Sequence, residues 1–167
     1  MKRWWPTACL ALLAWVMPVW AEHASIDLKV LHYDPQTLAL KDQVSASMDH
    51  DPPEGGSNPR PLLKVKAGDP LVLQFFFTNT YPHKDLKDAT IRYFVVREEK
   101  ANQKPLPDLT KDVVTDGQFT LNFKPQAKVG ARVAFTITKP GVYLIRVESV
   151  NTQSDHEHFA AIDVQVE

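Results

Sequence analysis

Cysteine is almost absent from this chain of 167 residues, which limits the chemistry available to it. The one cysteine, Cys9, lies inside an apolar stretch at the N-terminus. If that stretch is removed on export, the rest of the chain has no disulfide and no thiolate to bind a metal. Small exported domains often need disulfides when their core is thin. The roughly 146 residues after position 21 are enough to build a core without them.

An excess of basic residues is also missing. The chain has 19 Lys and Arg against 20 Asp and Glu, and removal of Lys2 and Arg3 would leave seventeen against twenty. A nucleic-acid-binding protein carries a basic excess or a basic stripe. The sequence shows neither, so we expect no nucleic acid among its partners.

Long apolar runs are confined to the N-terminus. Lys2 and Arg3 precede an apolar stretch, and Val19-Trp20-Ala21 is an acceptable cleavage site. This pattern predicts a signal peptide over residues 1–21, although an uncleaved anchor remains the alternative. We therefore expect a periplasmic or secreted protein with no membrane span after cleavage.

Helical periodicity is missing from the rest of the chain. Residues 26–33 alternate as a strand, and residues 45–61 are rich in Pro and Gly, which is typical of a linker. We assign residues 22–61 to an N-terminal strand segment with this linker and residues 62–167 to the main domain. Short strands separated by turn residues predict an all-β fold, a single antiparallel sandwich. The expected strands of the domain are 71–80, 89–99, 118–124, 131–138, 142–149 and 158–166. Asp116-Gly117 is a hairpin signal between two of these short runs.

The stretch Thr138-Lys139-Pro140-Gly141-Val142-Tyr143-Leu144-Ile145-Arg146-Val147-Glu148 resembles the penultimate-strand corner of immunoglobulin-like and fibronectin type III-like domains. The resemblance covers roughly residues 62–167. It implies an immunoglobulin-like β-sandwich in which Tyr143 anchors the corner, and it implies nothing about function. The disulfide and the core Trp of antibody domains are missing, which argues against an antibody-type domain.

One face of the predicted domain carries more apolar side chains than a solvated face needs. The resemblance implies that strands 89–99, 142–149 and 158–166 share a sheet, whose outer face would carry Phe94, Val96, Leu144 and Phe159. A contiguous apolar patch often marks an interface with a partner, here one in the cell envelope. Alternatively, the N-terminal segment covers it with Ile26, Leu28, Val30, Leu38 and Leu40.

The histidines are the candidates for metal binding. Counting back from Ile162 with period two places His158 and His156 on the inner face of the last strand. Neutral imidazole suits copper and zinc. His83 lies in the loop after strand 71–80, which in the resembled fold is at the same end of the sandwich. Asp155, His50 and Met48 are further candidate ligands. The alternatives are that these histidines satisfy buried backbone groups or are solvated surface residues.

Catalytic motifs are not apparent. The chain has no nucleophile elbow, no glycine-rich phosphate loop and no His-Glu-x-x-His. We expect a non-catalytic binding or accessory module that takes copper or zinc through loop-end histidines. The alternative is a metal-free interaction or structural module that uses the apolar outer face.

Overall fold

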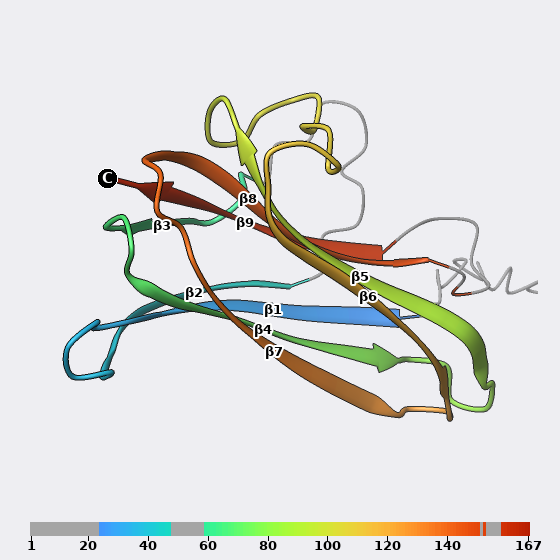
Figure 1. Cartoon of the computed structure of the whole chain (residues 1–167). Coiled ribbons are helices and arrows are strands. Elements are labelled where there is room, and N and C mark those ends of the chain that lie inside the picture. The colour runs from blue at the N-terminus through green and yellow to red at the C-terminus, as the bar shows by residue number, and fades with distance from the viewer. Residues whose placement is uncertain (1–23, 48–58, 151, 153–157) are drawn as a thin grey trace, which may run out of the picture.

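The computed structural model describes residues 24–47, 59–150, 152 and 158–167, and it places them in two sheets packed face to face (Figure 1). The signal peptide predicted for residues 1–21 and most of the predicted linker lie outside the described residues. The strands are β1 (Ala24–Tyr33), β2 (Leu40–Ser47), β3 (Leu62–Val65), β4 (Pro70–Asn79), β5 (Leu86–Glu98), β6 (Val113–Phe123), β7 (Lys128–Thr136), β8 (Gly141–Val150) and β9 (His158–Val166).

The first sheet has the order β2-β1-β4-β7, and all its pairings are antiparallel. Strand β4 shows why these residues form a half-buried strand: its side chains alternate between buried and partly exposed along its whole length. The buried set is Leu71, Leu73, Phe75 and Phe77, which is the inner face that the period-two pattern predicts.

The second sheet has the order β3-β9-β8-β5-β6. Strand β3 pairs parallel with β9, and the other pairings are antiparallel. Strands β5, β8 and β9 are neighbours in this sheet, which confirms the prediction that they belong together. Every strand expected between residues 71 and 166 is present.

The N-terminal segment is part of the sandwich, although its sequence suggested a separate element. Strand β1 lies between β2 and β4 in the first sheet, and it buries Ala24, Ile26, Leu28 and Val30 completely in the core. It therefore fills the interior of the sandwich and does not cover the outer face of the second sheet. Strand β2 has mostly exposed side chains, and no period-two apolar pattern marks it in the sequence.

The Asp116-Gly117 hairpin prediction is wrong. Both residues lie inside β6, where Gly117 is opposite Tyr93 of β5. A Cβ atom on Gly117 would lie 2.6 Å from the Tyr93 ring. The glycine is therefore required because an aromatic ring covers it, and no turn occurs there.

The corner before β8 has the anchor that the sequence predicts. The Tyr143 hydroxyl donates a hydrogen bond of 2.8 Å to the carbonyl oxygen of Lys139. The ring of Tyr143 is buried in the core, so the bond fixes the turn to the interior.

The two sheets approach each other unevenly. Strands β1 and β2 come close to β9 on one side of the sandwich, whereas β6 and β7 do not approach each other in this way on the opposite side. The described residues contain no helix that is long and apolar enough to cross a bilayer.

Candidate functional site

The two candidate metal ligands that the structure describes, His83 and His158, lie at one end of the sandwich. Strand β4 ends at Asn79 beside Ala24, the first residue of β1. Strand β5 begins close by, and its Thr90 is paired with Val150, the last residue of β8. The end of β4, the start of β5, the end of β8 and the start of β9 therefore lie at the same end of the sandwich, as the resembled fold implied (Figure 1). We call this end the loop end.

Asn79 fixes the conformation of the connection that carries His83. Its fully buried side chain donates hydrogen bonds to the carbonyl oxygens of Lys84 and Lys124, at 2.8 and 3.0 Å. Its side-chain oxygen accepts a bond from the amide of Tyr81. One buried amide thus organises the β4–β5 connection and joins it to the turn after β6.

His83 and His158 are differently placed at the loop end. His83 is exposed on the β4–β5 connection. His158 is the first residue of β9, it is only 2% exposed, and it lies on the same face as the buried residues Ala160 and Ile162. The register predicted for His158 is therefore confirmed.

The other candidate ligands, Met48, His50, Asp155 and His156, lie outside the described residues. Within the part of the chain that the structure describes, no three His, Cys, Asp or Glu side chains gather in a way that could hold a metal ion. A site at this end would need at least one ligand from those remaining candidates.

The apolar outer face of the second sheet is largely covered, and the cover is a loop that the sequence did not indicate. Val96 and Leu144 are both fully buried, and Leu109 from the β5–β6 connection packs against them. These two predicted interface residues are therefore not available to a partner in this structure. Phe94 and Phe159 are only partly buried.

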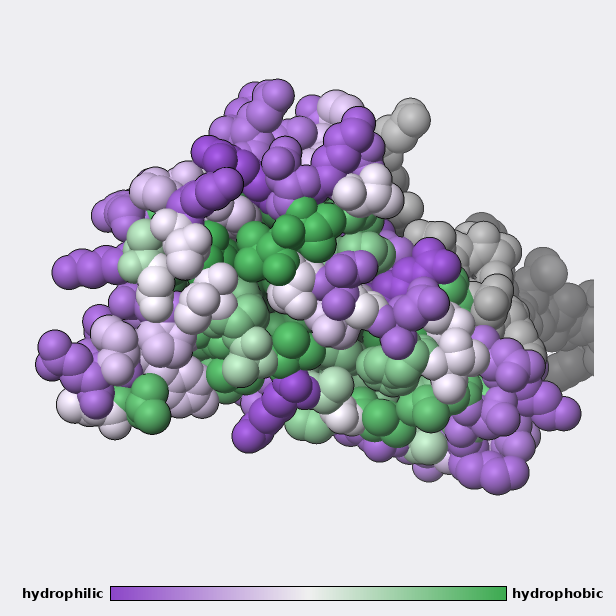
Figure 2. All heavy atoms as spheres, viewed as in Figure 1, coloured by the Kyte–Doolittle hydropathy of each residue, from purple (hydrophilic) through white to green (hydrophobic). Residues whose placement is uncertain are grey.

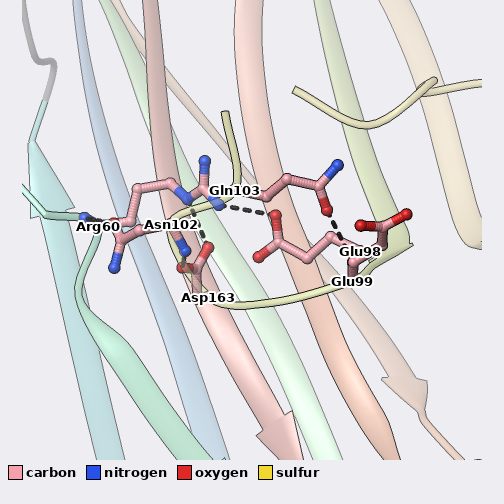
Figure 3. A network of polar contacts seen from close by, with 6 residues as sticks. All are labelled: Arg60, Glu98, Glu99, Asn102, Gln103 and Asp163. Atoms are coloured by element: carbon pink, nitrogen blue, oxygen red, sulfur yellow. Dashed lines mark hydrogen bonds and ion pairs between the residues drawn. The ribbon is translucent and has the colours of Figure 1, made fainter. Parts of the chain in front are cut away.

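The β5–β6 connection is tied down by a buried charged network (Figure 3). The Arg60 guanidinium lies between two carboxylates, with Nη2 2.7 Å from Oε2 of Glu98 and Nε 2.5 Å from Oδ1 of Asp163. Both carboxylate side chains are completely buried. The backbone N–H of Asn102, which lies in the β5–β6 connection, donates a hydrogen bond of 2.6 Å to Oδ2 of Asp163. The network therefore joins the segment before β3, the end of β5 and strand β9 to the connection.

Glu98 and Asp163 share the single cation of Arg60 in this network, and this arrangement changes the pKa of Glu98. Burial raises the pKa of Glu98 from 4.5 to about 7, and the Arg60 charge opposes the rise while Asp163 adds to it. The Oε1 atom of Glu98 has no hydrogen-bond partner in the part of the chain that the structure describes. Burial beside a second acid therefore favours the protonated form of Glu98 up to about neutral pH.

Beside the network, an open hollow of about 760 Å³ lies between the β5–β6 connection, the end of β5 and the start of β8. Its charged lining includes both signs: Arg97, Glu98, Glu99, Asp108, Lys111 and Asp112. Asp108 is held ionised by the connection itself, since hydrogen bonds from the hydroxyl and amide of Thr110 lower its pKa to about 2. The hollow therefore has no strong preference for ligands of one charge.

A second buried ionisable pair lies at the opposite end of the sandwich. His32 at the end of β1 is 2.7 Å from Oδ2 of Asp69, and both residues are buried. Asp69 also accepts a bond from the amide of Lys66 in the turn before β4. The pair gives His32 a structural role at the end of the sandwich away from His83.

Sequence reasoning missed the Arg60 network because its members are far apart in the chain. The signals were present as charges at positions where the strand pattern expects apolar or solvated residues. Asp163 interrupts the run Ala160-Ala161-Ile162-Asp163-Val164, and Glu98 closely follows the apolar run 93–96 at the end of β5. A buried acid in such a run needs a cation, and Arg60 provides it.

Comparisons with known proteins do not assign the chain to a family. The sequence matches no protein-family model and no curated protein. One similar solved structure is the soluble domain of PmoD from Methylocystis sp. ATCC 49242 (Rockwell), with 12% identity, 84% of this chain and 90% of that chain covered, and a TM-score of 0.44. Another is a family 123 glycoside hydrolase from Clostridium perfringens, with 11% identity and a TM-score of 0.44. That match covers 68% of this chain, which spans only 23% of the hydrolase. Likenesses this distant leave the function to be argued from the residues.

Proposed function

We propose that this chain is an exported, non-catalytic binding module of immunoglobulin-like topology that takes a copper or zinc ion at its loop end. One observation carries the proposal. The connection with His83 and the start of β9 with His158 lie at the same end of the sandwich, although seventy-odd residues separate them.

The two described histidines of the loop end are held in different ways. His83 is exposed on a connection held by Asn79. His158 begins the strand that follows the stretch Ser154-Asp155-His156-Glu157. In this proposal His83, His156 and His158 supply imidazole nitrogens, which is the ligand type that copper and zinc share. Asp155 is the nearest candidate for a carboxylate ligand or for a hydrogen-bond partner of a ligating histidine.

The export part of the proposal rests on the N-terminal sequence. Lys2 and Arg3 precede the apolar run, and the remaining chain has no cysteine, so its ligands would be histidine, carboxylate and methionine. A metal-binding module of this kind acts by sequestering or delivering the ion.

Metal retention tests the proposal. The protein is loaded with copper or zinc and dialysed, and its metal content is measured for the wild type and for His83→Ala. His32→Gln is the matched control, because it removes a histidine at the opposite end and leaves a side chain that can bond to Asp69. We expect stoichiometric retention by the wild type and the control, and its loss in His83→Ala. Retention that His83→Ala does not change would overturn the proposal.

The second candidate is a metal-free partner-binding module. It is favoured by Phe94 and Phe159, which stay partly exposed beside the covered residues Val96 and Leu144. Failure of the wild type to retain any metal, together with loss of a copurifying partner in a Phe94→Ser/Phe159→Ser variant, would support this candidate instead.

A further inference from the structure

The side of the sandwich formed by β6 and β7 has two unpaired strand edges. Among the residues that the structure describes, strand β6 ends the second sheet and β7 ends the first, so each is hydrogen-bonded along one edge only. A short turn reverses the chain between them, and they run in opposite directions on the two sheets (Figure 1). Both strands are long, from Val113 to Phe123 and from Lys128 to Thr136.

The interior of the sandwich is incompletely covered along this side. Residues of β6 and β7 that face inward pack against the core and yet remain partly exposed, namely Phe119, Val129, Ala131, Val133 and Phe135. Leu121, on the same face of β6, is 38% exposed. Figure 2 shows apolar atoms gathered in a band over the strip where β6 and β7 face the viewer. The core therefore reaches the surface between the two free edges.

Strand β6 carries little of the charge that protects an edge, and its one irregularity is the register shift between Thr115 and Val113, near its start. Natural edge strands are commonly guarded by Lys, Pro or an inward-pointing charge. The stretch from Val113 to Phe123 contains no Lys, Arg or Pro, and its only charge is Asp116. The side chain of Asp116 is exposed, and no hydrogen bond or ion pair joins it to the described residues.

The opposite charge lies on the other free edge. Arg132 is exposed in the middle of β7 and, within the described ranges, takes part in no ion pair. The two levels correspond across the sandwich. Arg132 is next to Ala131, which pairs with Phe75. The Phe75 ring lies 6.3 Å from the ring of Tyr93, and Tyr93 pairs with Gly117, the residue next to Asp116 in β6.

We propose that a second copy of this chain docks on this side, with β6 of each copy pairing antiparallel to β7 of the other. A two-fold axis parallel to the strands produces this arrangement, because it keeps strand direction and exchanges the two sheets across the interface. Each sheet of one copy then continues into a sheet of the other. Arg132 of each copy lies near Asp116 of the other, so the interface contains this contact twice. The partly exposed inner residues of both copies close over one another, as a self-complementary two-fold interface requires.

Charge selects this pairing over its alternatives. A β7–β7 pairing would bring the basic Arg132 and Lys128 of two copies together, and a β6–β6 pairing would do the same for Asp116. Like charges on facing strands destabilise a pairing, and opposite charges favour it. Only the pairing of β6 with β7 gives both free edges a partner strand of opposite charge.

Sedimentation velocity of the protein expressed from its complete sequence tests the inference, over a wide concentration range and at low and high salt. We expect a monomer–dimer equilibrium for the wild type. Arg132→Asp and Asp116→Arg should each raise the dimer Kd by about tenfold or more, and high salt should narrow the difference. The double variant Arg132→Asp/Asp116→Arg restores the opposite charges and should recover the dimer.

Lys64→Asp is the matched control, because it also reverses an exposed basic residue, but on β3, the edge strand at the opposite side of the second sheet from β6. A wild type that stays monomeric at the highest concentration would overturn the inference. A dimer that survives both single reversals, or that the double variant fails to restore, would also overturn it.

Discussion

The guanidinium of Arg60 lies 2.7 Å from the Glu98 carboxylate, and it comes from a residue 38 positions earlier in the chain. Only 13% of the Arg60 side chain is exposed, and the same guanidinium also binds Asp163. The network holds the β5–β6 connection over Val96 and Leu144. It therefore determines how much apolar surface the second sheet shows to solvent.

Removal of Arg60 should be among the costliest single changes in the protein. Arg60→Ala leaves the buried Asp163 carboxylate and the neighbouring Glu98 carboxyl group without a cation, and breaking a buried pair in this way costs about 3–5 kcal/mol. We expect a loss of that size in the free energy of unfolding, measured with urea. Arg92→Ala, at a partly exposed arginine on the outer face of β5, should change the value by less than about 0.5 kcal/mol. Equal losses in the two variants would contradict a structural role for the network.

Stability should fall as Glu98 loses its proton. The folded-state pKa of Glu98 is about 7, against an ordinary value of 4.5. Between those values the folded protein holds a proton that the unfolded chain releases, so the free energy of unfolding decreases as pH rises through this window. Glu98→Gln keeps the shape of the protonated acid and removes the titration.

The comparison of wild type with Glu98→Gln isolates this effect from other carboxyl groups. The wild type should lose stability relative to the variant by up to about 3 kcal/mol between pH 4.5 and pH 7, and the difference should then level off. Urea unfolding at a series of pH values measures it. A difference that stays constant with pH would show that Glu98 titrates normally.

Gly117 should tolerate no side chain. Its added Cβ would lie 2.6 Å from the Tyr93 ring, which packs on the inner face, so Gly117→Ala should cost about 1–3 kcal/mol. Gly130→Ala meets the Phe76 ring at 2.5 Å, but that ring is on the outer face and partly exposed, so it has room to move. We expect a smaller loss there.

The Gly117 effect should depend on the ring above it. In a Tyr93→Ala background, Gly117→Ala should be nearly neutral, so the two changes should show a coupling free energy in a double-mutant cycle. Thermal or urea unfolding of the four proteins provides the values. Additive losses would show that the Tyr93 ring is not what requires a glycine at position 117.

The period-two pattern of the sequence was enough to predict the strands of the main domain and the inner faces of β4, β8 and β9. It was sufficient because each of these strands has one face in the core, and burial then imposes the alternation. It also predicted the register of His158, whereas the anchor role of Tyr143 was implied by the resemblance to immunoglobulin-like domains. The resembled fold implied that β4 and β8 end at the same end of the sandwich, and the pairing of Thr90 with Val150, near the start of β5, agrees with this.

Where the sequence misled, the cause was long-range packing. Gly117 looked like a turn residue, because the ring of Tyr93 that requires it is on another strand. The sequence pattern did not predict strand β2, because its side chains are mostly exposed and burial imposes no alternation of apolar and polar residues on it. The cover over Val96 comes from Leu109, an isolated apolar residue in a polar connection, and only the tertiary structure shows that it folds back.

The most direct test of metal binding at the loop end is an NMR titration that follows the imidazole nitrogens of the six histidines as zinc is added. The proposed function predicts that the signals of His83, His156 and His158 shift together and saturate at one equivalent, while the signal of His32, bonded to Asp69 at the other end, stays in place. Shifts that spread over all histidines without saturation, or a His83 signal that does not move, would contradict it.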